Sequence, residues 1–316
     1  MRLIYRVFIM LALLACAPAS AVAWHDQGHM IVAQVAYLRL TPAAKAKVDA
    51  LFVTPAGKRP LIFLCAGYYS PATCEKTYDP VQIAVWMDDF RGDSINSTYD
   101  NWHYVDYPFY DGVPDTGKVG PDAENALARI NWAINSLREG ISAPKREAEV
   151  MAFLYHLVGD VHQPLHAAAR VTAAHPDGDA GGNLFKIQVP GQARVGNLHT
   201  FWDAVGGAFG FDGPKRPLDQ AGKDRILSLA QDVMKDYPAE SMPESKDIDP
   251  HTWVMESYKL AREVVYRNIT DGGEPSKEYT DAAQKLCRKR LALAGYRLAG
   301  VLNALSATPP TPPPAK

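Results

Sequence analysis

The run from Tyr155 to His166 constrains this chain more than any other stretch. His156 and Asp160 are four residues apart, so on a helix their side chains lie on one face, one turn apart. Pro164 cannot continue a helix, because it lacks an N–H group and clashes with the preceding turn, so His166 lies just past the helix end. Two interpretations follow: a buried histidine paired with an aspartate, or a set of ligands for zinc. One such pair alone favours the first.

The remaining pattern predicts a mostly helical protein. Thr41-Pro42, Asp79-Pro80 and Asp249-Pro250 each combine a capping residue with a proline suited to the first helical turn. Apolar spacing adds further helices, and Gly140 ends the helix before the His156 run. Besides the run at 30–40, the expected helices cover about 42–52, 79–91, 122–139, 144–160, 223–237, 250–268 and a long stretch ending at 305.

Two short segments have the pattern of extended chain. Residues 101–106 are aromatic and β-branched with alternation, which predicts a short strand. Residues 184–189 also alternate, and with 193–195 they predict a small β-hairpin. The sequence has no internal repeat and no clear domain boundary. We therefore predict one mainly α, multi-helix domain over residues 24–306 that carries a small β-hairpin.

Composition and the two chain ends limit the class of protein. With 316 residues, 47% of them apolar, the chain can bury one or two cores, and a net charge of −2 gives no broad basic field for nucleic acid. Residues 1–23 are typical of a secretory signal peptide, with an apolar run too short to span a membrane and the cleavage signature Ala21-Val22-Ala23. Removing its two arginines would lower the charge from −2 to −4. A lipoprotein-like sequence ending at Cys16 is a rival to cleavage after Ala23. At the other end of the chain, the Pro-rich tail 307–316 is predicted to be disordered.

Secretion would place the cysteines in an oxidising compartment, which favours a disulfide. Cys65, Cys74 and Cys287 remain after signal removal, and a Cys65–Cys74 disulfide is the preferred of three possible pairings. None of the three has the spacing of a metal site. Any zinc would therefore depend on histidine and aspartate.

Counting histidines changes the balance between the two interpretations of His156. The chain has nine histidines. Five of them stand in short, unusual contexts beside Asp or Gly: His29, His103, His156, His166 and His199. His199 and Asp203 repeat the spacing of His156 and Asp160. Two such pairs and three further histidines favour a site with several metal ions, with structural zinc and a buried polar network as alternatives.

Several short motifs, in this order along the chain, carry a family resemblance. They are Trp24 with Gly28-His29, Trp86-x-Asp88-x-x-Arg91, Trp102-His103-Tyr104-x-Asp106, the His156 to His166 run, Gly181-Gly182-Asn183, Asn197-Leu198-His199-x-x-Trp202-Asp203 and Ala294-Gly295-x-Arg297-Leu298-Ala299. The chain resembles the secreted, single-strand-specific, trinuclear-zinc nucleases of fungi, plants and bacteria, also called nuclease/3′-nucleotidases. These are related to bacterial zinc phospholipase C. The resemblance covers nearly the whole chain after residue 23, although His25 and the length of 167–180 depart from the family pattern.

The resemblance implies three zinc ions per chain and names their ligands. The first ion would be held by Asp88, His103, His156 and Asp160. The second would be held by the terminal amine and carbonyl oxygen of Trp24, by His29, and by Asp160 as a bridge. The third would be held by His166, His199 and Asp203. An amine ligand requires cleavage between Ala23 and Trp24, and thus a secreted or periplasmic enzyme.

The resemblance also implies a mechanism and a substrate. Hydroxide bridging two zincs would attack phosphorus and leave a 5′-phosphate, with Asp88, Asp160 and Arg91 as catalytic residues. Tyr104 would stack an unpaired base, Asp106 would bind its edge and Asn183 would line the pocket. The expected substrates are single-stranded DNA and RNA and 3′-nucleotides, with no membrane and no obligate protein partner. A zinc phospholipase C, and a non-catalytic zinc-binding protein, remain as alternatives.

Overall fold

The computed structural model describes residues 24–52, 79–90 and 97–307, and helices dominate it. The α-helices are α1 (Asp26–Leu38), α2 (Pro42–Phe52), α4 (Ala126–Glu139), α5 (Pro144–Asp160), α6 (Leu198–Asp203), α7 (Gln220–Asp236), α8 (Pro250–Leu260) and α9 (Lys277–Ala307). Short 3₁₀ helices include η2 (Gln82–Val85), η3 (Asp88–Phe90), η4 (Ser97–His103), η5 (Pro164–Ala167), η6 (Val205–Gly207), η7 (Ala239–Ser241) and η8 (Pro243–Lys246), and a π turn, η9 (Ala261–Val265), follows α8. The prediction of a mainly α, single-domain fold is confirmed.

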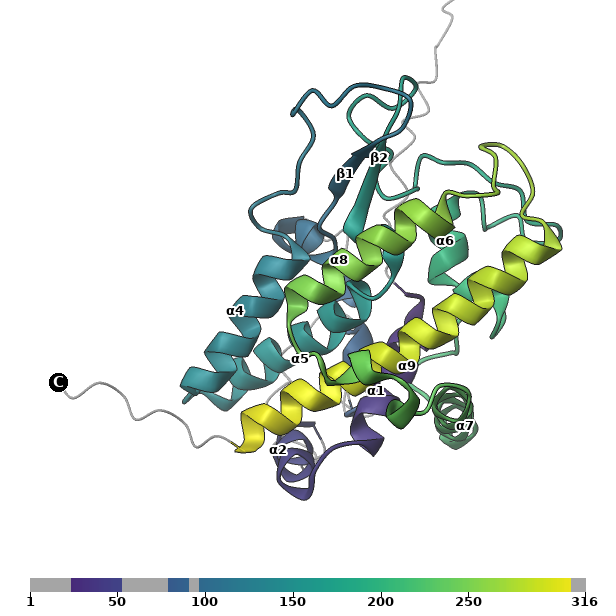
Figure 1. Cartoon of the computed structure of the whole chain (residues 1–316). Helices are drawn as coiled ribbons and strands as arrows, with labels where there is room; N and C mark the ends of the chain where they lie inside the picture. Colours follow the sequence, from purple (N-terminus) through teal and green to yellow (C-terminus); the bar gives the residue numbers. More distant parts are fainter. Residues whose placement is uncertain (1–23, 53–78, 91–96, 308–316) are drawn as a thin grey trace, which may run out of the picture.

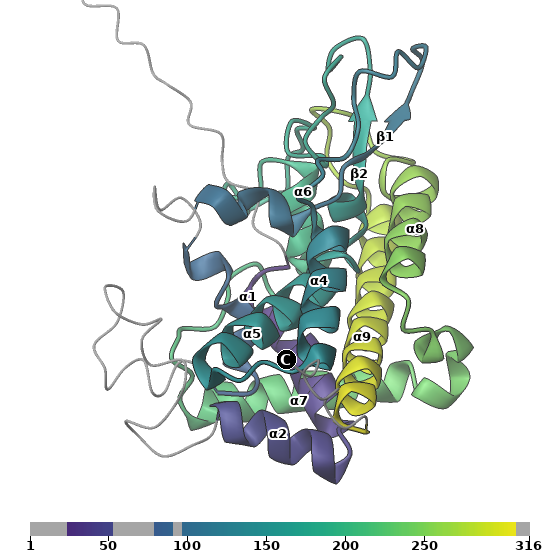
Figure 2. The same ribbon diagram turned by 90° about the vertical axis from the view of Figure 1, so that its left-hand side faces the viewer.

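Helices α1 and α9 form the centre of the core. Figures 1 and 2 show α9 as a long rod that crosses the molecule, with α1 packed against it. Gly295 of α9 permits this packing, because a Cβ there would lie 2.5 Å from the Cβ of Val35 in α1. Arg290 and Arg297 of α9 both bond Glu256 of α8, and these ion pairs tie α8 to α9. The core thus packs α1 and α5, which both carry candidate ligands, against α9.

Several predicted helix ends are found where a proline or a glycine sets them, but α4 begins at Ala126 rather than at residue 122. Helix α5 begins at Pro144 and ends at Asp160. In α4 the Asn125 side chain accepts the Ala128 N–H, and Gly140 follows the last turn with φ 88°. Proline at the first turn and a positive φ at the end act locally, so the sequence alone reveals them.

Three predicted elements are wrong. The described part of the segment 79–91, up to Phe90, is not an α-helix but contains the separate 3₁₀ helices η2 and η3. Asp79 caps its start by accepting from Val81 N and Gln82 N. The segment 101–106 is not a strand, since η4 runs to His103. The hairpin at 184–195 is absent from the described residues, where a single antiparallel bridge joins Lys186 and Asn197.

The small sheet comes instead from two segments far apart in sequence. Strand β1 (Tyr107–Tyr110) pairs in parallel with β2 (Ala168–Val171), and Tyr107 lies opposite Ala168. Alternation within one segment cannot reveal a partner that distant. The helix expected at 250–268 also ends early, since α8 stops at Leu260 and the π turn follows.

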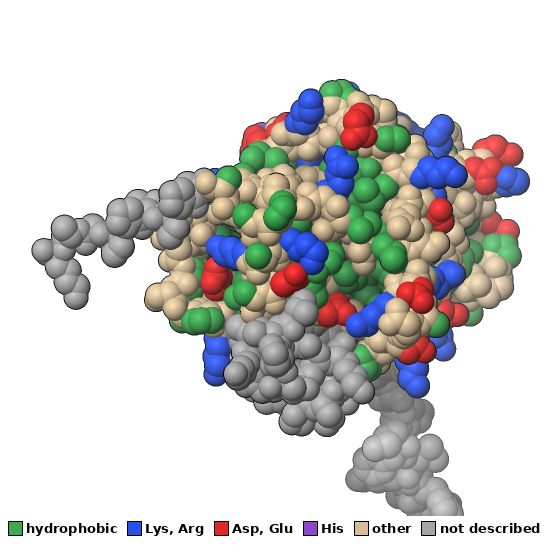
Figure 3. Space-filling view, turned by 90° about the horizontal axis from the view of Figure 1, so that it is seen from below, with side chains coloured by type: hydrophobic (Ala, Val, Ile, Leu, Met, Phe, Trp, Pro, Cys, Tyr) green, Lys and Arg blue, Asp and Glu red, His purple; other side chains and the backbone are tan. Residues whose placement is uncertain are grey.

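Several predictions fall outside the described residues: the signal peptide, Arg91, the Cys65–Cys74 disulfide and most of the Pro-rich tail. Cys287 is a buried thiol in α9. No described helix has the length and hydropathy needed to cross a membrane. On the face in Figure 3, basic and acidic side chains are interspersed around a patch of hydrophobic ones, so that face has no basic field for a polyanion.

Candidate metal centre

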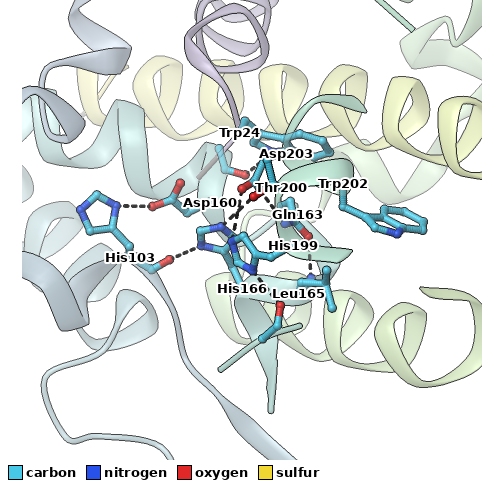
Figure 4. Close-up of polar contacts among 12 residues, drawn as sticks. Trp24, His103, Asp160, Gln163, Leu165, His166, His199, Thr200, Trp202 and Asp203 are labelled. Atoms are coloured by element: carbon cyan, nitrogen blue, oxygen red, sulfur yellow. Dashed lines mark hydrogen bonds and ion pairs between the residues drawn. The ribbon is translucent and has the colours of Figure 1, made fainter. Parts of the chain in front are cut away.

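Eight histidines and aspartates converge from six elements into three clusters. The elements are α1, η3, η4, α5, η5 and α6. The eight residues are His29, Asp88, His103, His156, Asp160, His166, His199 and Asp203. Figure 4 shows part of this assembly, with His103 and Asp160 on one side and His166, His199 and Asp203 on the other. The structure therefore brings together every described side chain that the resemblance names as a ligand through its imidazole or carboxylate.

The first cluster joins α5 to η3 and η4. Asp160 Oδ2 lies 3.1 Å from His103 Nδ1 and 3.3 Å from His156 Nε2. Asp88 Oδ1 closes the group at 3.8 Å from His103 Nδ1 and 3.6 Å from His156 Nε2. The helical spacing of His156 and Asp160 thus presents two ligand atoms to one point, as expected.

The second cluster adds α1. His29 Nε2 lies 3.3 Å from Asp160 Oδ1, so the two oxygens of one carboxylate face two different clusters. The His29 ring stacks on that of His156 with centroids 4.0 Å apart. Gly159 makes room for it, since a Cβ there would lie 2.6 Å from His29 Nδ1. We call these first two clusters, which share Asp160 and His156, the paired cluster.

The third cluster lies at α6 and η5. His199 Nε2 is 3.4 Å from Asp203 Oδ2, and His166 Nε2 is 3.8 Å from Asp203 Oδ1. Gln163 orients the carboxylate, because its Nε2 donates to Asp203 Oδ1 at 2.7 Å while its Oε1 accepts the Leu165 N–H. Here two ligand atoms come from a single helical turn.

Backbone carbonyls fix the orientation of three of the imidazoles. Nδ1 of His156 donates to Ala84 O, that of His166 to His103 O and that of His199 to Gly181 O, at 2.6, 2.6 and 2.7 Å. Each Nε2 then faces its cluster, where it can bind a metal ion once it carries no proton. An outer hydrogen bond of this kind is what orients metal-bound histidine in proteins.

Trp24 is buried at the junction of the clusters. Its indole Nε1 donates to Gly159 O at 2.8 Å, and the His25 N–H that follows it donates to Asp203 O at 3.1 Å. Figure 4 places Trp24 beside Asp160 and Asp203. The segment that starts α1 is therefore tied to both the paired and the third cluster.

The protonation behaviour of the site reflects carboxylates held among imidazoles. Burial opposes ionisation, yet the charge of Asp160 and Asp88 raises the pKa of His156 to about 9. His156, His103 and His29 together hold the pKa of Asp160 well below its usual range, despite its burial. Burial lowers the pKa of His29, and His156 lowers it further. A cation that binds must displace the proton from His156, so its affinity will rise with pH.

The side chains fit a metal ion better than they fit one another. His29 Nε2, Asp160 Oδ1 and His166 Nε2 are buried but make no aligned hydrogen bond within the described part of the chain. Such a group costs about 1–3 kcal/mol when unsatisfied. Bonds of about 2.1 Å in a tetrahedral shell place neighbouring ligand atoms about 3.4 Å apart, close to the 3.1–3.8 Å separations found here. Nitrogen and carboxylate donors in this arrangement suit zinc.

A family model for the S1/P1 nucleases matches residues 24–307. The chain belongs to the S1/P1 nuclease family. Endonuclease 1 of Arabidopsis thaliana is 26% identical over 94% of the chain and 92% of its own length. Nuclease S1 of Aspergillus oryzae is 26% identical over 72% of the chain and 79% of its own. Nuclease P1 of Penicillium citrinum is 24% identical over 89% of the chain and 97% of its own length. This protein is a single-strand-specific nuclease, a hydrolase of phosphodiesters.

Tyr104, Asp106 and Asn183 are the residues predicted to contact substrate, and we call them the rim. Tyr104 is half-buried and donates from its hydroxyl to Asn101 Oδ1 at 2.8 Å. Asp106 follows in the left-handed region, with φ 56°. Burial raises the pKa of Asp106 to about 7, against the effect of His166 and with that of Asp179. Positive φ at a residue other than glycine is strained and is often found at functional sites.

Asn183 ends a tight loop beside the third cluster. Its Nδ2 donates to Ala180 O, and Ala180, Gly181 and Gly182 all have positive φ. Gly181 O accepts the proton of His199 Nδ1, so this loop also orients a candidate ligand.

Sequence reasoning missed several residues that shape the site of this nuclease. Gln163 was read only as part of a motif, and Gly159 as part of a helix. Arg216 was not singled out at all, although it bonds Asp26 and Asp89 beside the paired cluster. No local pattern announces it, because its partners lie 190 and 127 residues away in the chain.

Proposed function

We propose that this S1/P1 nuclease is a zinc-dependent endonuclease and 3′-nucleotidase that cuts single-stranded DNA and RNA to leave 5′-phosphates. The observation that supports it most is Asp160, whose two oxygens face separate groups of imidazoles. A carboxylate in that position is suited to bridging two cations, and two-metal sites are a recurring means of hydrolysing phosphodiesters.

The proposed ligands are those that the clusters bring together. Asp88, His103, His156 and Asp160 would hold the first zinc, and His166, His199 and Asp203 the third. His29, Asp160 and the amine and carbonyl oxygen of Trp24 would hold the second. When bound, the ions supply a water activated at mild pH and positive charge for the phosphodiester.

The chain's own side chains prepare the site for that chemistry. Carbonyl acceptors keep His156, His166 and His199 with Nε2 toward the clusters, so binding requires no reorientation of these rings. Their burial excludes bulk water, which strengthens every electrostatic interaction inside. Arg91, outside the described residues, is proposed to neutralise charge on the phosphoryl oxygens.

The rim would select unpaired bases. Tyr104 is half-buried and offers a ring on which a base can stack, and Asp106 offers a carboxyl to its edge. Asn183 would line the same pocket beside the third cluster. A duplex presents neither a free base face nor a free edge there, so duplex DNA should be cut poorly.

The proposed location follows from Trp24. An amine ligand exists only if the chain is cut between Ala23 and Trp24, which implies secretion or export to the periplasm. The tie of Trp24 Nε1 to Gly159 O supports this, because it holds the start of α1 at the paired cluster.

The deciding assay compares single-stranded DNA, duplex DNA and phosphatidylcholine with protein that begins at Trp24. A chelator should abolish cleavage of single strands, and zinc should restore it with 5′-phosphate ends. Hydrolysis of the lipid but not of DNA would point to a phospholipase C. Zinc binding with no hydrolysis of any of the three would contradict the proposal.

A further inference from the structure

Arg216 lies in the segment between η6 and α7 and bonds two carboxylates at once. Its Nε donates to Asp26 Oδ2 at 2.6 Å, and its two terminal nitrogens donate to Asp89 Oδ2 and Oδ1 at 3.0 and 2.6 Å. The Arg216 side chain is 12% exposed, and those of Asp26 and Asp89 are 28% and 10% exposed. The planar guanidinium thus bonds Asp26 through Nε and Asp89 through both terminal nitrogens, an arrangement that the single ammonium of lysine cannot reproduce.

The two carboxylates stand directly beside proposed ligands from different segments. Asp26 is the first residue of α1, between Trp24 and His29. Asp89 follows Asp88 in the short helix η3. One guanidinium therefore connects the segment that would hold the second zinc to the segment that contributes Asp88 to the first.

This connection matters because each segment depends on a short or terminal piece of backbone. Asp88 lies in a three-residue 3₁₀ helix, and Trp24 precedes the first turn of α1. Such short or terminal pieces are usually the first to open locally. The bonds of Trp24 and His25 hold the start of α1 to α5 and α6, and those of Arg216 hold it to η3.

We propose that Arg216 is a positioning residue that fixes the distance between Asp88 and the Trp24–His29 segment, so that the second zinc is retained. The inference depends on the proposed zinc site. Arg216 does not contact substrate in this account, because Nε and both terminal nitrogens are already bonded to carboxylates and little of the side chain is exposed.

The test measures zinc release from the full chain beginning at Trp24, using a coloured chelator, for wild type, Arg216→Gln and Arg216→Lys. Arg225→Gln is the control, since Arg225 bonds the 204–219 segment at Phe209 O and, within the described residues, makes no bond to Asp26 or Asp89. We expect Arg216→Gln to lose one zinc roughly 10–100-fold faster than wild type, as when outer partners of metal ligands are removed. The rate of zinc release from Arg216→Lys should lie between those of wild type and Arg216→Gln. The rate for Arg225→Gln should equal that of wild type.

The outcomes separate this inference from the proposed function. Three zincs released from Arg216→Gln at the wild-type rate would overturn the inference alone. A higher KM at unchanged zinc release would also overturn it, by making Arg216 a substrate contact. A wild type that binds no zinc would refute the proposed function as well. If Arg216→Gln does not fold, Asp26→Asn and Asp89→Asn each remove one side of the fork, and each must speed release for the inference to hold.

Discussion

The paired cluster and the third cluster use the same side chains but are assembled differently. In the paired cluster the ligand atoms come from α1, η3, η4 and α5. His156 belongs to both groups, and Asp160 presents one oxygen to each. In the third cluster His199 and Asp203 come from one turn of α6, and His166 joins them from η5. The difference teaches that the paired cluster depends on tertiary packing, whereas most of the third follows from local helical spacing.

Asp160→Asn should have the largest effect, because it alters both halves of the paired cluster at once. We expect two zincs to be lost and the rate of single-strand cleavage to fall roughly 1,000-fold or more, as a bridging charge is worth several kcal/mol. The matched variant Asp203→Asn should lose one zinc. Metal analysis after dialysis measures both, and equal losses from the two variants would contradict the shared role of Asp160.

Gly159→Ala tests the packing on which the paired cluster depends. The added methyl would lie 2.6 Å from His29 Nδ1, so the His29 ring or the α5 backbone must move, at about 1–3 kcal/mol. We expect weaker binding of the second zinc and an intact third cluster. Calorimetry, with zinc titrated into the metal-free variant and into wild type, would measure these affinities. Unchanged affinity at all sites would mean that His29 is not held as described.

Gln163→Leu tests the outer bond of the third cluster. Without the 2.7 Å bond to Asp203 Oδ1, the carboxylate loses its orientation. We expect roughly 10–100-fold weaker binding of one zinc. His162→Gln, at the neighbouring position but facing Arg297 rather than a cluster, is the comparison variant. A larger loss of zinc from His162→Gln than from Gln163→Leu would contradict the role of Gln163 in orienting Asp203.

The smallest effect on zinc binding and cleavage is expected at Asp106, whose substitution would instead change how stability depends on pH. The pKa of Asp106 is raised from 3.8 to about 7 by burial, so its ionisation costs stability as pH rises between those values. In the metal-free protein, Asp106→Asn should therefore gain stability relative to wild type from about pH 4 to about pH 7 and stay level above. Zinc near His166 favours the carboxylate and should move this change to lower pH. Thermal melts of both proteins across this pH range measure the difference in stability. A difference that does not change with pH would contradict the prediction.

The contrast between the clusters also explains what the sequence could predict. The His-x-x-x-Asp spacing, the start of α5 at Pro144 and the break before His166 all depend on local geometry, and all are found in the structure. The 3₁₀ helices around Asp88 and His103 were mispredicted, because segments of three and seven residues are too short to show a period. Arg216 and the β1–β2 pairing depend on contacts between distant segments, which no local pattern contains.

The central claim is that one chain holds three zincs, two of them joined through Asp160. Its most direct test is to add zinc stepwise to metal-free protein beginning at Trp24, while measuring cleavage of single-stranded DNA at each equivalent. The account predicts saturation at three equivalents, with little activity until the paired cluster is filled. Full activity at one equivalent, or saturation at one, would contradict it.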